Sequence, residues 1–322
     1  MSIALLFKEY FEQNRLLGAP QSLYEPADYM MQLGGKRMRP QLLLMSCELF
    51  AGDVAAALPA AFAVEIFHNF TLVHDDMMDE SPMRRGQPTV HIKYGQNTSI
   101  LSGDAMLILA YRYLAKCNSE KLSQILAIFN KFAIEVCEGQ QHDMDFERRT
   151  DVTIDDYLKM IELKTSVLLA GAMQIGAVLA GASEADTTHI YEFGLHIGIA
   201  FQIRDDILDT FGDPTTFGKR IGGDIVQNKK TILILKALEI ADAPTQADLR
   251  HALGKPTTAE DEIAKINYVT NILKKLNIEH FATDLQRTYQ KRAFEHLAAV
   301  SVSEKQKTAL RQVTNELFGR EI

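Results

Sequence analysis

The sequence predicts an all-α protein, and three observations support this prediction. Apolar residues recur at helical spacing along most of the 322 residues, and no segment shows the alternation of a convincing strand. Capping-box pairs mark helix starts, and breaks with glycine or proline separate about ten helical segments. Several segments are apolar on most faces, as helices at the centre of a fold are. We therefore expect one large helical bundle with an inner ring and an outer shell, forming a single domain over residues 1–322.

The predicted elements follow one another from the N-terminus. Residues 1–20 carry charges inside their apolar pattern, which indicates an amphipathic helix and not a signal peptide. The runs 55–73 and 193–203 are mostly apolar, and each leads into an acidic cluster. Residues 167–182 are apolar apart from Gln174, but they are shorter than the ~20 residues that cross a bilayer. The predicted capping boxes pair Thr153 with Asp156, Ser183 with Asp186, Thr257 with Glu260, and Ser303 with Gln306.

Composition excludes several classes of protein. Apolar residues make up 47% and charged residues 24%, which excludes disordered and collagen-like chains. The net charge of −8 disfavours a nucleic-acid partner. Three widely spaced cysteines without a C-x-x-C pattern, Cys47, Cys117 and Cys137, favour a reducing compartment and buried, inert thiols. We expect a soluble, cytoplasmic protein without stable membrane insertion.

Two short acidic clusters are the most informative feature of the chain. Both have the pattern D-D-x-x-D, with Asp75, Asp76 and Asp79 in the first and Asp205, Asp206 and Asp209 in the second. Helix residues four apart share a face, so the first and last aspartates of each cluster point the same way. Negative charge near a helix C-terminus is unfavourable, and two carboxylates ~4 Å apart repel by ~4 kcal/mol at an effective dielectric of ~20. Such hard oxygen ligands favour Mg²⁺.

Other interpretations of the acidic clusters fit less well. One such cluster alone is more often a solvated helix end. An EF-hand loop starting at Asp75 needs Gly at its sixth position and Glu at its twelfth, where the chain has Glu80 and Gly86. A di-iron bundle needs two Glu-x-x-His motifs, and Glu65 to His68 has no second copy at a matching helical position.

Three basic groups lie close to these clusters in the sequence. They are residues 34–40, the pair Arg84 and Arg85, and the pairs Lys219-Arg220 and Lys229-Lys230. Arginine and lysine are the usual ligands of phosphate. A single basic pair is more often a solubilising surface feature, but repeated pairs beside acidic clusters favour diphosphates held between Mg²⁺ and basic side chains. Two clusters and three basic groups suggest two diphosphates.

These motifs resemble those of the trans-isoprenyl (all-E polyprenyl) diphosphate synthases. The resemblance covers roughly residues 30–235 and rests on GGKRMRP (34–40), EIFHNFTLVHDDMMDESPMRRGQPTVH (65–91), GQQHD (139–143), KT (164–165), FQIRDDILDTFGD (201–213) and GKRIGGDIVQNKKT (218–231). It implies an isoprenoid-synthase fold with a central cavity, a short-chain synthase of the farnesyl or geranylgeranyl diphosphate type, and a homodimer. The implied reaction condenses isopentenyl diphosphate with an allylic diphosphate through ionisation, condensation and elimination.

The resemblance also implies a role for each matching position. Three Mg²⁺ ions are expected per site, with Asp75, Asp79 and Asp205 as their ligands. Asp76, Asp206 and Asp209 are expected to support these ligands. Gln140 and Asp143 are expected to line the metal site. The expected ligands of the allylic diphosphate are Arg84, Lys164, Lys219 and Lys229. Those of isopentenyl diphosphate are Lys36, Arg39, His68 and Arg85. Thr165 and Gln202 are expected to face the reacting carbons.

Product length is expected to depend on the helix below Asp75. Thr71 lies one turn back on the same face, and Phe70 lies one residue further. In the family, aromatic residues at both positions favour a C15 product, and an aromatic at only the deeper one resembles C20 synthases. Here only the deeper residue, Phe70, is aromatic. Phe67, which lies under Thr71, can still close the bottom of the product-binding space. Geranylgeranyl diphosphate is therefore the expected product, and farnesyl diphosphate is the alternative. The other interpretation of Phe70 and Thr71 is that both residues only pack the core.

Two other functions stay open at this point. A terpene cyclase usually keeps a single D-D-x-x-D motif, whereas this chain has two. A non-catalytic regulatory subunit of a heteromeric synthase is expected to have lost some of the carboxylates, and all six are present. Both observations favour the synthase.

Overall fold

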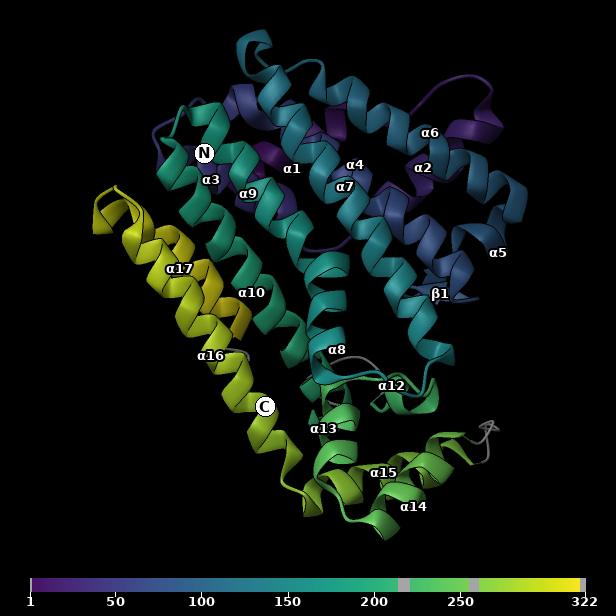
Figure 1. The fold of residues 1–322 in the computed structure, drawn as a ribbon. Helices are drawn as coiled ribbons and strands as arrows, with labels where there is room; N and C mark the ends of the chain where they lie inside the picture. The colour runs from purple at the N-terminus through teal and green to yellow at the C-terminus, as the bar shows by residue number, and fades with distance from the viewer. Residues whose placement is uncertain (1, 214–220, 255–260, 319–322) are drawn as a thin grey trace. The chain divides into compact units, whose positions relative to one another are not determined.

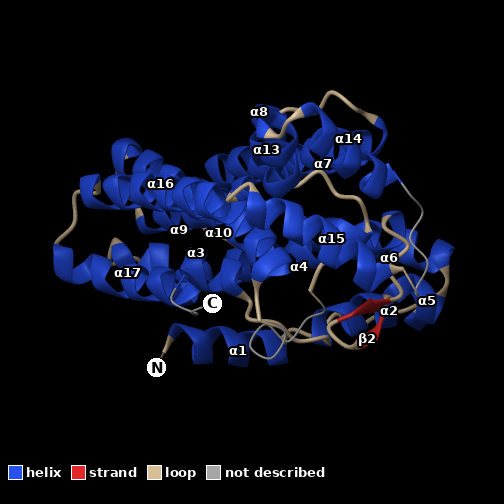
Figure 2. Cartoon of the chain, turned by 90° about the horizontal axis from the view of Figure 1, so that it is seen from below, coloured by secondary structure: helices blue, strands red, loops and turns tan. Residues whose placement is uncertain are grey.

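The structure, a computed structural model, describes residues 2–213, 221–254 and 261–318. These residues are almost entirely helical, which confirms the predicted all-α class (Figures 1 and 2). The first helices are α1 (Ile3–Gln13), α2 (Gln21–Gln32), α3 (Met38–Leu49), α4 (Val54–Met78), α5 (Val90–Tyr94), α6 (Gln96–Leu114), α7 (Ser119–Arg148) and α8 (Ile154–Ile161). A π-helix, η1 (Glu162–Ser166), then leads into α9 (Val167–Ala180) and α10 (Glu184–Phe211). The remaining helices are α12 (Gly223–Val226), α13 (Ile232–Ile240), α14 (Ala243–Gly254), α15 (Glu262–Lys275), α16 (Ile278–Ala299) and α17 (Glu304–Phe318).

Two very short strands form the β structure of the described residues. β1 (Met83–Arg84) and β2 (Gln87–Pro88) pair antiparallel, and they are red in Figure 2. The turn between them consists of Arg85 and Gly86, with φ values of 51° and 75°, as the tightest hairpin turns require. The sequence pattern did not predict this hairpin, because two-residue strands are too short to show alternation.

The chain divides into two compact units. Unit 1 comprises Met1–Lys131, Gly171–Tyr191 and Val300–Leu310, and unit 2 comprises Phe132–Ala170, Glu192–Ala299 and Arg311–Ile322. Four helices, α7, α9, α10 and α17, contribute residues to both units. The single domain over residues 1–322 stays a prediction.

The long helix α4 forms the centre of unit 1, where α3 and α6 pack against it. The Asp53 side chain caps its first turn and accepts hydrogen bonds from the amides of residues 55 and 56 at 2.9 and 3.2 Å. Gly103 allows α6 to approach closely, because a Cβ there would lie 2.2 Å from Nε2 of His74. This packing fixes the C-terminal end of α4, which carries the first acidic cluster.

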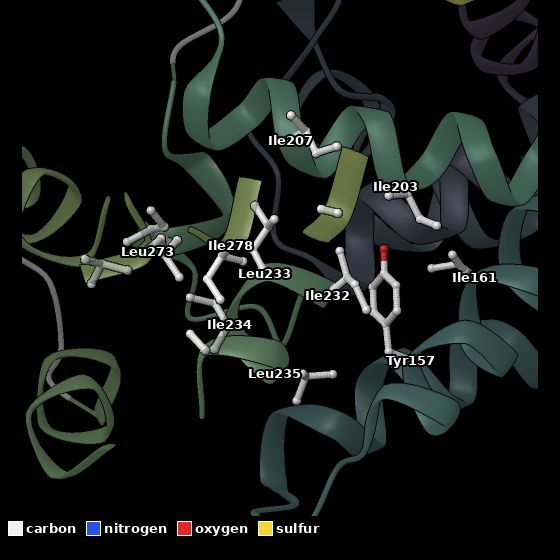
Figure 3. Packing of buried hydrophobic residues seen from close by; sticks show 14 of the residues in the cluster. Tyr157, Ile161, Ile203, Ile207, Ile232, Leu233, Ile234, Leu235, Leu273 and Ile278 are labelled. Carbon is white, nitrogen blue, oxygen red and sulfur yellow. The ribbon is translucent and has the colours of Figure 1, made fainter. Parts of the chain in front are cut away.

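The core of unit 2 surrounds the buried helix α13. Ile203 and Ile207 of α10 belong to this core, together with Leu233 of α13 and Tyr157 of α8 (Figure 3). The four consecutive residues 232–235 are all buried, so the first turn of α13 is apolar and enclosed on every side. This core holds the segment of α10 that carries the second acidic cluster.

Two helical stretches are long and apolar enough to span a membrane by length and composition. They are Val54–Met78 and Ile154–Ala180, and 72% and 67% of their most apolar windows are buried within the structure. The second stretch is longer than the segment 167–182 considered from the sequence, because α8, η1 and α9 follow one another without a break. Such burial is typical of core helices, which pass the same test.

The predicted helix caps are confirmed where the structure describes them. Thr153 and Asp156 form a complete capping box, the amide of Asp186 donates to Ser183 Oγ at 3.1 Å, and the amide of Ser303 donates to Gln306 Oε1 at 3.1 Å. Thr257 and Glu260 lie outside the described residues.

The cysteine prediction holds at two of three positions. Cys47 and Cys117 are buried, and burial raises the pKa of each thiol to about 11. Cys137 is exposed, so the prediction of a buried thiol is wrong there. Its neighbour Val136 occupies the buried side of α7, and the ~100° step between adjacent helix residues turns Cys137 outward.

Candidate active site

The first acidic cluster lies at the C-terminal end of α4 in unit 1. The amide of Asp79 donates to the carbonyl oxygen of Asp75 at 2.9 Å, so the helical path continues through the cluster. Their side chains therefore share one face, one turn apart. The Asp75 side chain is 20% exposed and Asp79 is exposed, whereas Asp76 is only 1% exposed. The first and last aspartates are thus the accessible carboxylates of this cluster.

The buried Asp76 holds Arg84. Arg84 Nε lies 2.9 and 2.7 Å from the two carboxylate oxygens of Asp76, and its Nη2 lies 3.9 Å from Asp75 Oδ2. Burial raises the pKa of Asp76, and the hydrogen bond from Arg84 opposes this shift. Residues 79–82 turn the chain back after α4, so Arg84 in β1 reaches the end of that helix. Arg84 is therefore fixed beside the two accessible aspartates.

A basic group predicted to bind a diphosphate gathers around His68 in unit 1. Arg39 Nη1 lies 3.1 Å from His68 Nε2, and because arginine can only donate, Nε2 is the accepting nitrogen. Burial and the nearby arginines hold the pKa of His68 well below its usual value, so the ring is neutral. Burial also lowers the pKa of Arg39 to about 10. The Nε of Arg39 is buried and has no hydrogen-bond partner among the described residues, which suits an anionic ligand.

The loop at residues 34–36 lies against Arg85. Arg85 Nη1 donates to the carbonyl oxygen of Gly34. Gly35 has a φ of 122°, and a Cβ there would lie 2.9 Å from Arg85 Cζ, so only glycine fits without a shift. Lys36 follows directly and is exposed. The structure thus places Gly34 and Gly35 against Arg85, and Arg39 against His68.

Sequence reasoning missed the buried Glu65 as a member of this group. Its side chain lies one turn before His68 on α4, and the residue is 3% exposed. Asn69 Nδ2 donates to Glu65 Oε1 at 3.1 Å and to its backbone oxygen at 2.8 Å. Burial raises the pKa of Glu65, while Asn69 and the arginines oppose this shift. The only sequence signal was the Glu-x-x-His spacing, which was considered as part of a di-iron site and set aside for lack of a second copy.

The residues predicted to set product length form an aromatic cluster in unit 1. The ring centroids of Phe67 and Phe70 are 5.6 Å apart, and Phe70 also contacts His74 at 4.9 Å. Thr71 is partly buried and donates its hydroxyl to the carbonyl of residue 68 at 2.8 Å. Phe129 of α7 packs edge-on against Phe67 at 5.2 Å. Phe129 could not be found from the sequence, because it lies on a different helix far along the chain.

The second acidic cluster lies in the last two turns of α10, in unit 2. Asp206 is 4% exposed and accepts two hydrogen bonds, from Tyr157 Oη at 2.6 Å and from Gln202 Nε2 at 3.2 Å. In Figure 3 the Tyr157 hydroxyl points toward α10. Burial and the nearby carboxylate of Asp224 raise the pKa of Asp206 to about 8. Asp205 is only partly buried, so the second aspartate is again the anchored one.

A further carboxylate, Asp224 of α12, joins the second cluster. Its amide donates to Asp209 Oδ2 at 3.0 Å, and Lys229 Nζ lies 3.6 Å from Asp224 Oδ1. Burial and the charge of Asp224 raise the pKa of Asp209 to about 6. Asp224 belongs to the motif at 218–231, but no role was predicted for it. Lys219, predicted to bind the allylic diphosphate, lies outside the described residues.

The π-helix η1 positions Lys164 and Thr165 in unit 2. Lys164 Nζ donates to Asp143 Oδ2 at 2.7 Å, and Thr165 Oγ1 donates to Gln202 Oε1 at 3.5 Å. A Cβ at Gly139 would lie 2.2 Å from the backbone nitrogen of Lys164, so α7 approaches η1 directly. Gln140 is half-buried beside this contact. π-Helical turns occur frequently at functional sites because they displace side chains from the regular helix pattern.

The donor atoms fit the magnesium that the motifs imply. The accessible carboxylates supply hard oxygen ligands, and burial, together with the nearby negative charge of Asp224, raises the pKa values of Asp206 and Asp209 in unit 2. A divalent cation relieves such repulsion, and carboxylate oxygens are the protein ligands that Mg²⁺ prefers.

Comparison with known proteins identifies the family. A family model described as polyprenyl synthetase matches residues 20–269. The chain belongs to the polyprenyl synthetase family. It is therefore a prenyltransferase, and the resemblance noted from the two D-D-x-x-D motifs is confirmed.

Individual relatives cover most of the chain. It is 39% identical to a geranylgeranyl diphosphate synthase of Sulfolobus acidocaldarius over 288 residues, which cover 88% of this chain and 86% of that protein. It is 37% identical to a geranylfarnesyl diphosphate synthase of Natronomonas pharaonis over 260 residues, covering 73% and 76%. A crystal structure of geranylgeranyl pyrophosphate synthase matches with a TM-score of 0.95 and 42% identity, covering 100% of this chain and 98% of that one.

Proposed function

We propose that this prenyltransferase condenses isopentenyl diphosphate with allylic diphosphates in a Mg²⁺-dependent reaction and releases geranylgeranyl diphosphate. The observation that carries the proposal is the matching organisation of the two acidic clusters. In each, the second aspartate is buried and hydrogen-bonded within its own unit, by Arg84 for Asp76 and by Tyr157 for Asp206. The other aspartates are more exposed and available for cations.

Three Mg²⁺ ions per site are part of the proposal. The residues that would hold them are Asp75, Asp79 and Asp205, with Asp209, Asp143 and Gln140 nearby in the motifs. When bound, Mg²⁺ neutralises the departing diphosphate and so favours ionisation of the allylic substrate.

The basic side chains bind and orient the two diphosphates. Arg84, Lys164 and Lys229 are the proposed ligands of the allylic diphosphate, together with Lys219. Lys36, Arg39, His68 and Arg85 are the proposed ligands of isopentenyl diphosphate. Because His68 is neutral and its Nε2 accepts from Arg39, its proton is on Nδ1, which can donate to a diphosphate oxygen. The unpartnered Nε of Arg39 supplies a second donor.

Ionisation of the allylic substrate forms a carbocation. Unreactive polar groups can stabilise this cation, and water must be kept away from it. The Thr165 hydroxyl and the Gln202 amide form one hydrogen-bonded pair, and their fixed dipoles suit the reacting carbons proposed for them. The aromatic side chains near Thr71 provide apolar walls, which exclude the water that would quench a cation.

Product length provides a separate test of this assignment. We expect Thr71→Phe to shorten the main product by one isoprene unit, because the ring fills space one turn below Asp75. Phe70→Ala should lengthen it, because removing the ring opens the aromatic cluster. Chromatography of the released chains, after the diphosphates are removed, measures both. Unchanged products in both variants would show that these residues only pack the core, and a main wild-type product of C15 would favour farnesyl diphosphate.

The oligomeric state, location and partners of the protein are also part of what we propose. We propose a homodimeric, cytoplasmic enzyme formed as a single domain, with small-molecule substrates, no nucleic-acid partner and no stable membrane insertion. The acidic net charge supports the absence of a nucleic-acid partner, and the burial of both apolar helical stretches supports the absence of membrane insertion. Exposed apolar side chains on α6, Leu101 at 60% and Ile108 at 67%, lie seven residues apart on one face and suit a subunit contact.

The direct experiment incubates the purified chain with Mg²⁺, isopentenyl diphosphate and each of three allylic starters: dimethylallyl, geranyl and farnesyl diphosphate. We expect elongated prenyl diphosphates that form only when isopentenyl diphosphate is present. A hydrocarbon formed without isopentenyl diphosphate would indicate a terpene cyclase. No product, together with no thermal stabilisation by Mg²⁺ and a diphosphate analogue, would indicate a non-catalytic subunit.

A further inference from the structure

Three metal-ligating side chains gather in unit 2 outside the proposed active-site residues. Glu192 and His196 lie on α10, and His296 lies on α16. One ligand atom from each side chain lies within 4.8 Å of the other two. None of the three has a part in the proposed prenyl transfer, so their proximity needs another explanation.

The packing of two helices holds these groups in place. Glu192 and His196 are four residues apart, so they share one face of α10. α16 runs beside α10 (Figure 1), and the rings of Phe193 and Phe294 are in contact with centroids 6.2 Å apart. The imidazoles of His196 and His296 are nearly parallel, with an interplanar angle of 25° and centroids 5.5 Å apart. The two histidines are therefore held by a ring contact and are not isolated surface groups.

The hydrogen bonding of His196 leaves one ring nitrogen for a ligand. Its Nδ1 lies 2.7 Å from the backbone oxygen of Glu192 and 3.7 Å from Glu192 Oε2; the nearer oxygen can only accept, so Nδ1 carries the proton. In the neutral ring the lone pair is then on Nε2. A histidine that donates one ring N–H to a carbonyl oxygen is the usual arrangement among metal ligands, because the hydrogen bond fixes the ring. The side chains of His196 and Glu192 are 15% and 32% exposed, so an ion could reach them while remaining partly shielded.

We propose that Glu192, His196 and His296 form a binding site for a divalent transition-metal ion, with Zn²⁺ as the best match. Two imidazole nitrogens and one carboxylate oxygen supply three of the four ligands of a tetrahedral zinc site, and water supplies the fourth. Mg²⁺ prefers all-oxygen ligands, so this site discriminates against the ion proposed for the aspartates.

Binding at this site links α10 to α16. The two histidines are separated by 100 positions in the sequence, so a shared ion closes a long loop of chain. Because the ion binds the folded chain, Zn²⁺ should raise the melting temperature. α10 also carries Asp205, nine positions after His196 and ~13.5 Å along the helix. The ion therefore stabilises the helix that presents the second acidic cluster.

The test measures Zn²⁺ affinity of the full chain in competition with a chromophoric chelator, with Mg²⁺ in large excess to occupy the aspartates. We expect one Zn²⁺ per chain. His296→Gln and Glu192→Gln should each weaken binding by at least about tenfold, since each removes one of three ligands. Melting with EDTA confirms that each variant is folded, and the rise in melting temperature caused by Zn²⁺ should disappear in the same variants.

The chain provides matched controls for this test. His280 lies on the same helix α16 and faces Asp284 four residues on, with Nε2 and Oδ2 3.2 Å apart, but the pair is exposed. His280→Gln should keep wild-type Zn²⁺ affinity, and so should Cys137→Ser and Asp205→Asn. Wild-type affinity in both His296→Gln and Glu192→Gln would overturn the proposal. Loss of the tight site in Cys137→Ser, Asp205→Asn or His280→Gln would also overturn it, because the ion would then be elsewhere.

Discussion

At the scale of single residues, the buried aspartates explain how each acidic cluster is organised. Asp206 has two hydrogen-bond donors, Tyr157 and Gln202, and its pKa is still raised to about 8. Burial therefore raises the pKa of Asp206 by more than its hydrogen bonds lower it. A carboxyl group with such a pKa binds its proton more tightly in the folded chain than in the unfolded one.

This linkage predicts how stability depends on pH without metal. The usual pKa of aspartate is about 3.9. The contribution of Asp206 to the stability of the folded chain is therefore complete below that pH, and it is lost as the pH rises through about 8. With EDTA, the wild-type melting temperature should fall between pH 6 and pH 8.5 by at least about 2 °C. Asp206→Asn, which has no charge to bury, should show a smaller fall in the same calorimetric scans. An equal fall in both proteins would assign the pH dependence to other groups.

At the scale of elements, glycines bring the helices of unit 2 against the π-helix η1. The Cβ positions at Gly139 and Gly198 would lie 2.2 Å from the nitrogen of Lys164 and 2.7 Å from Cα of Ser166. Both neighbours are backbone atoms, which cannot move aside as a flexible side chain can. The position of Lys164 beside Asp143 therefore depends on these small residues.

Gly139→Ala tests this dependence. We expect a loss of about 1–3 kcal/mol in the free energy of unfolding, together with reduced prenyl transfer, because the methyl group forces α7 away from η1. Gly254→Ala is the control, since a Cβ at that position would meet no atom of the described residues within 4 Å. Denaturant unfolding and steady-state rates measure both effects. If Gly139→Ala matched the control in stability and rate, close approach at η1 would be unimportant.

The sequence predicted the helical class and most of the charged site residues, but not several of the residues that pack against them. The spacing of D-D-x-x-D is a local pattern, so the aspartates are visible in the chain itself. Tyr157 is 49 positions from Asp206, and Phe129 and Phe67 lie on different helices, so only the folded chain brings these pairs together. The hairpin at residues 83–88 also escaped detection, because its pairing depends on a two-residue turn and not on alternation.

At the scale of the whole molecule, the assembly proposed here depends on exposed apolar residues of α6. Leu101→Glu combined with Ile108→Glu should convert a dimer into monomers, because two buried carboxylates per subunit oppose association. Ile263→Glu is the control, since Ile263 is equally exposed, at 68%, but lies on α15. Sedimentation velocity gives the mass of each protein. A wild-type monomer, or a dimer unaffected by the double substitution, would rule out this contact.

Both acidic clusters are proposed to serve one Mg²⁺-dependent reaction, and the turnover of Asp75→Asn and Asp205→Asn tests this proposal. Each replacement keeps the side-chain shape and removes one negative charge from a different unit. The expected result is a loss of at least about 100-fold in the rate of isopentenyl diphosphate incorporation at saturating Mg²⁺, with unchanged melting in EDTA. Turnover within about twofold of wild type in either variant, at the same Mg²⁺ concentration, would contradict the claim.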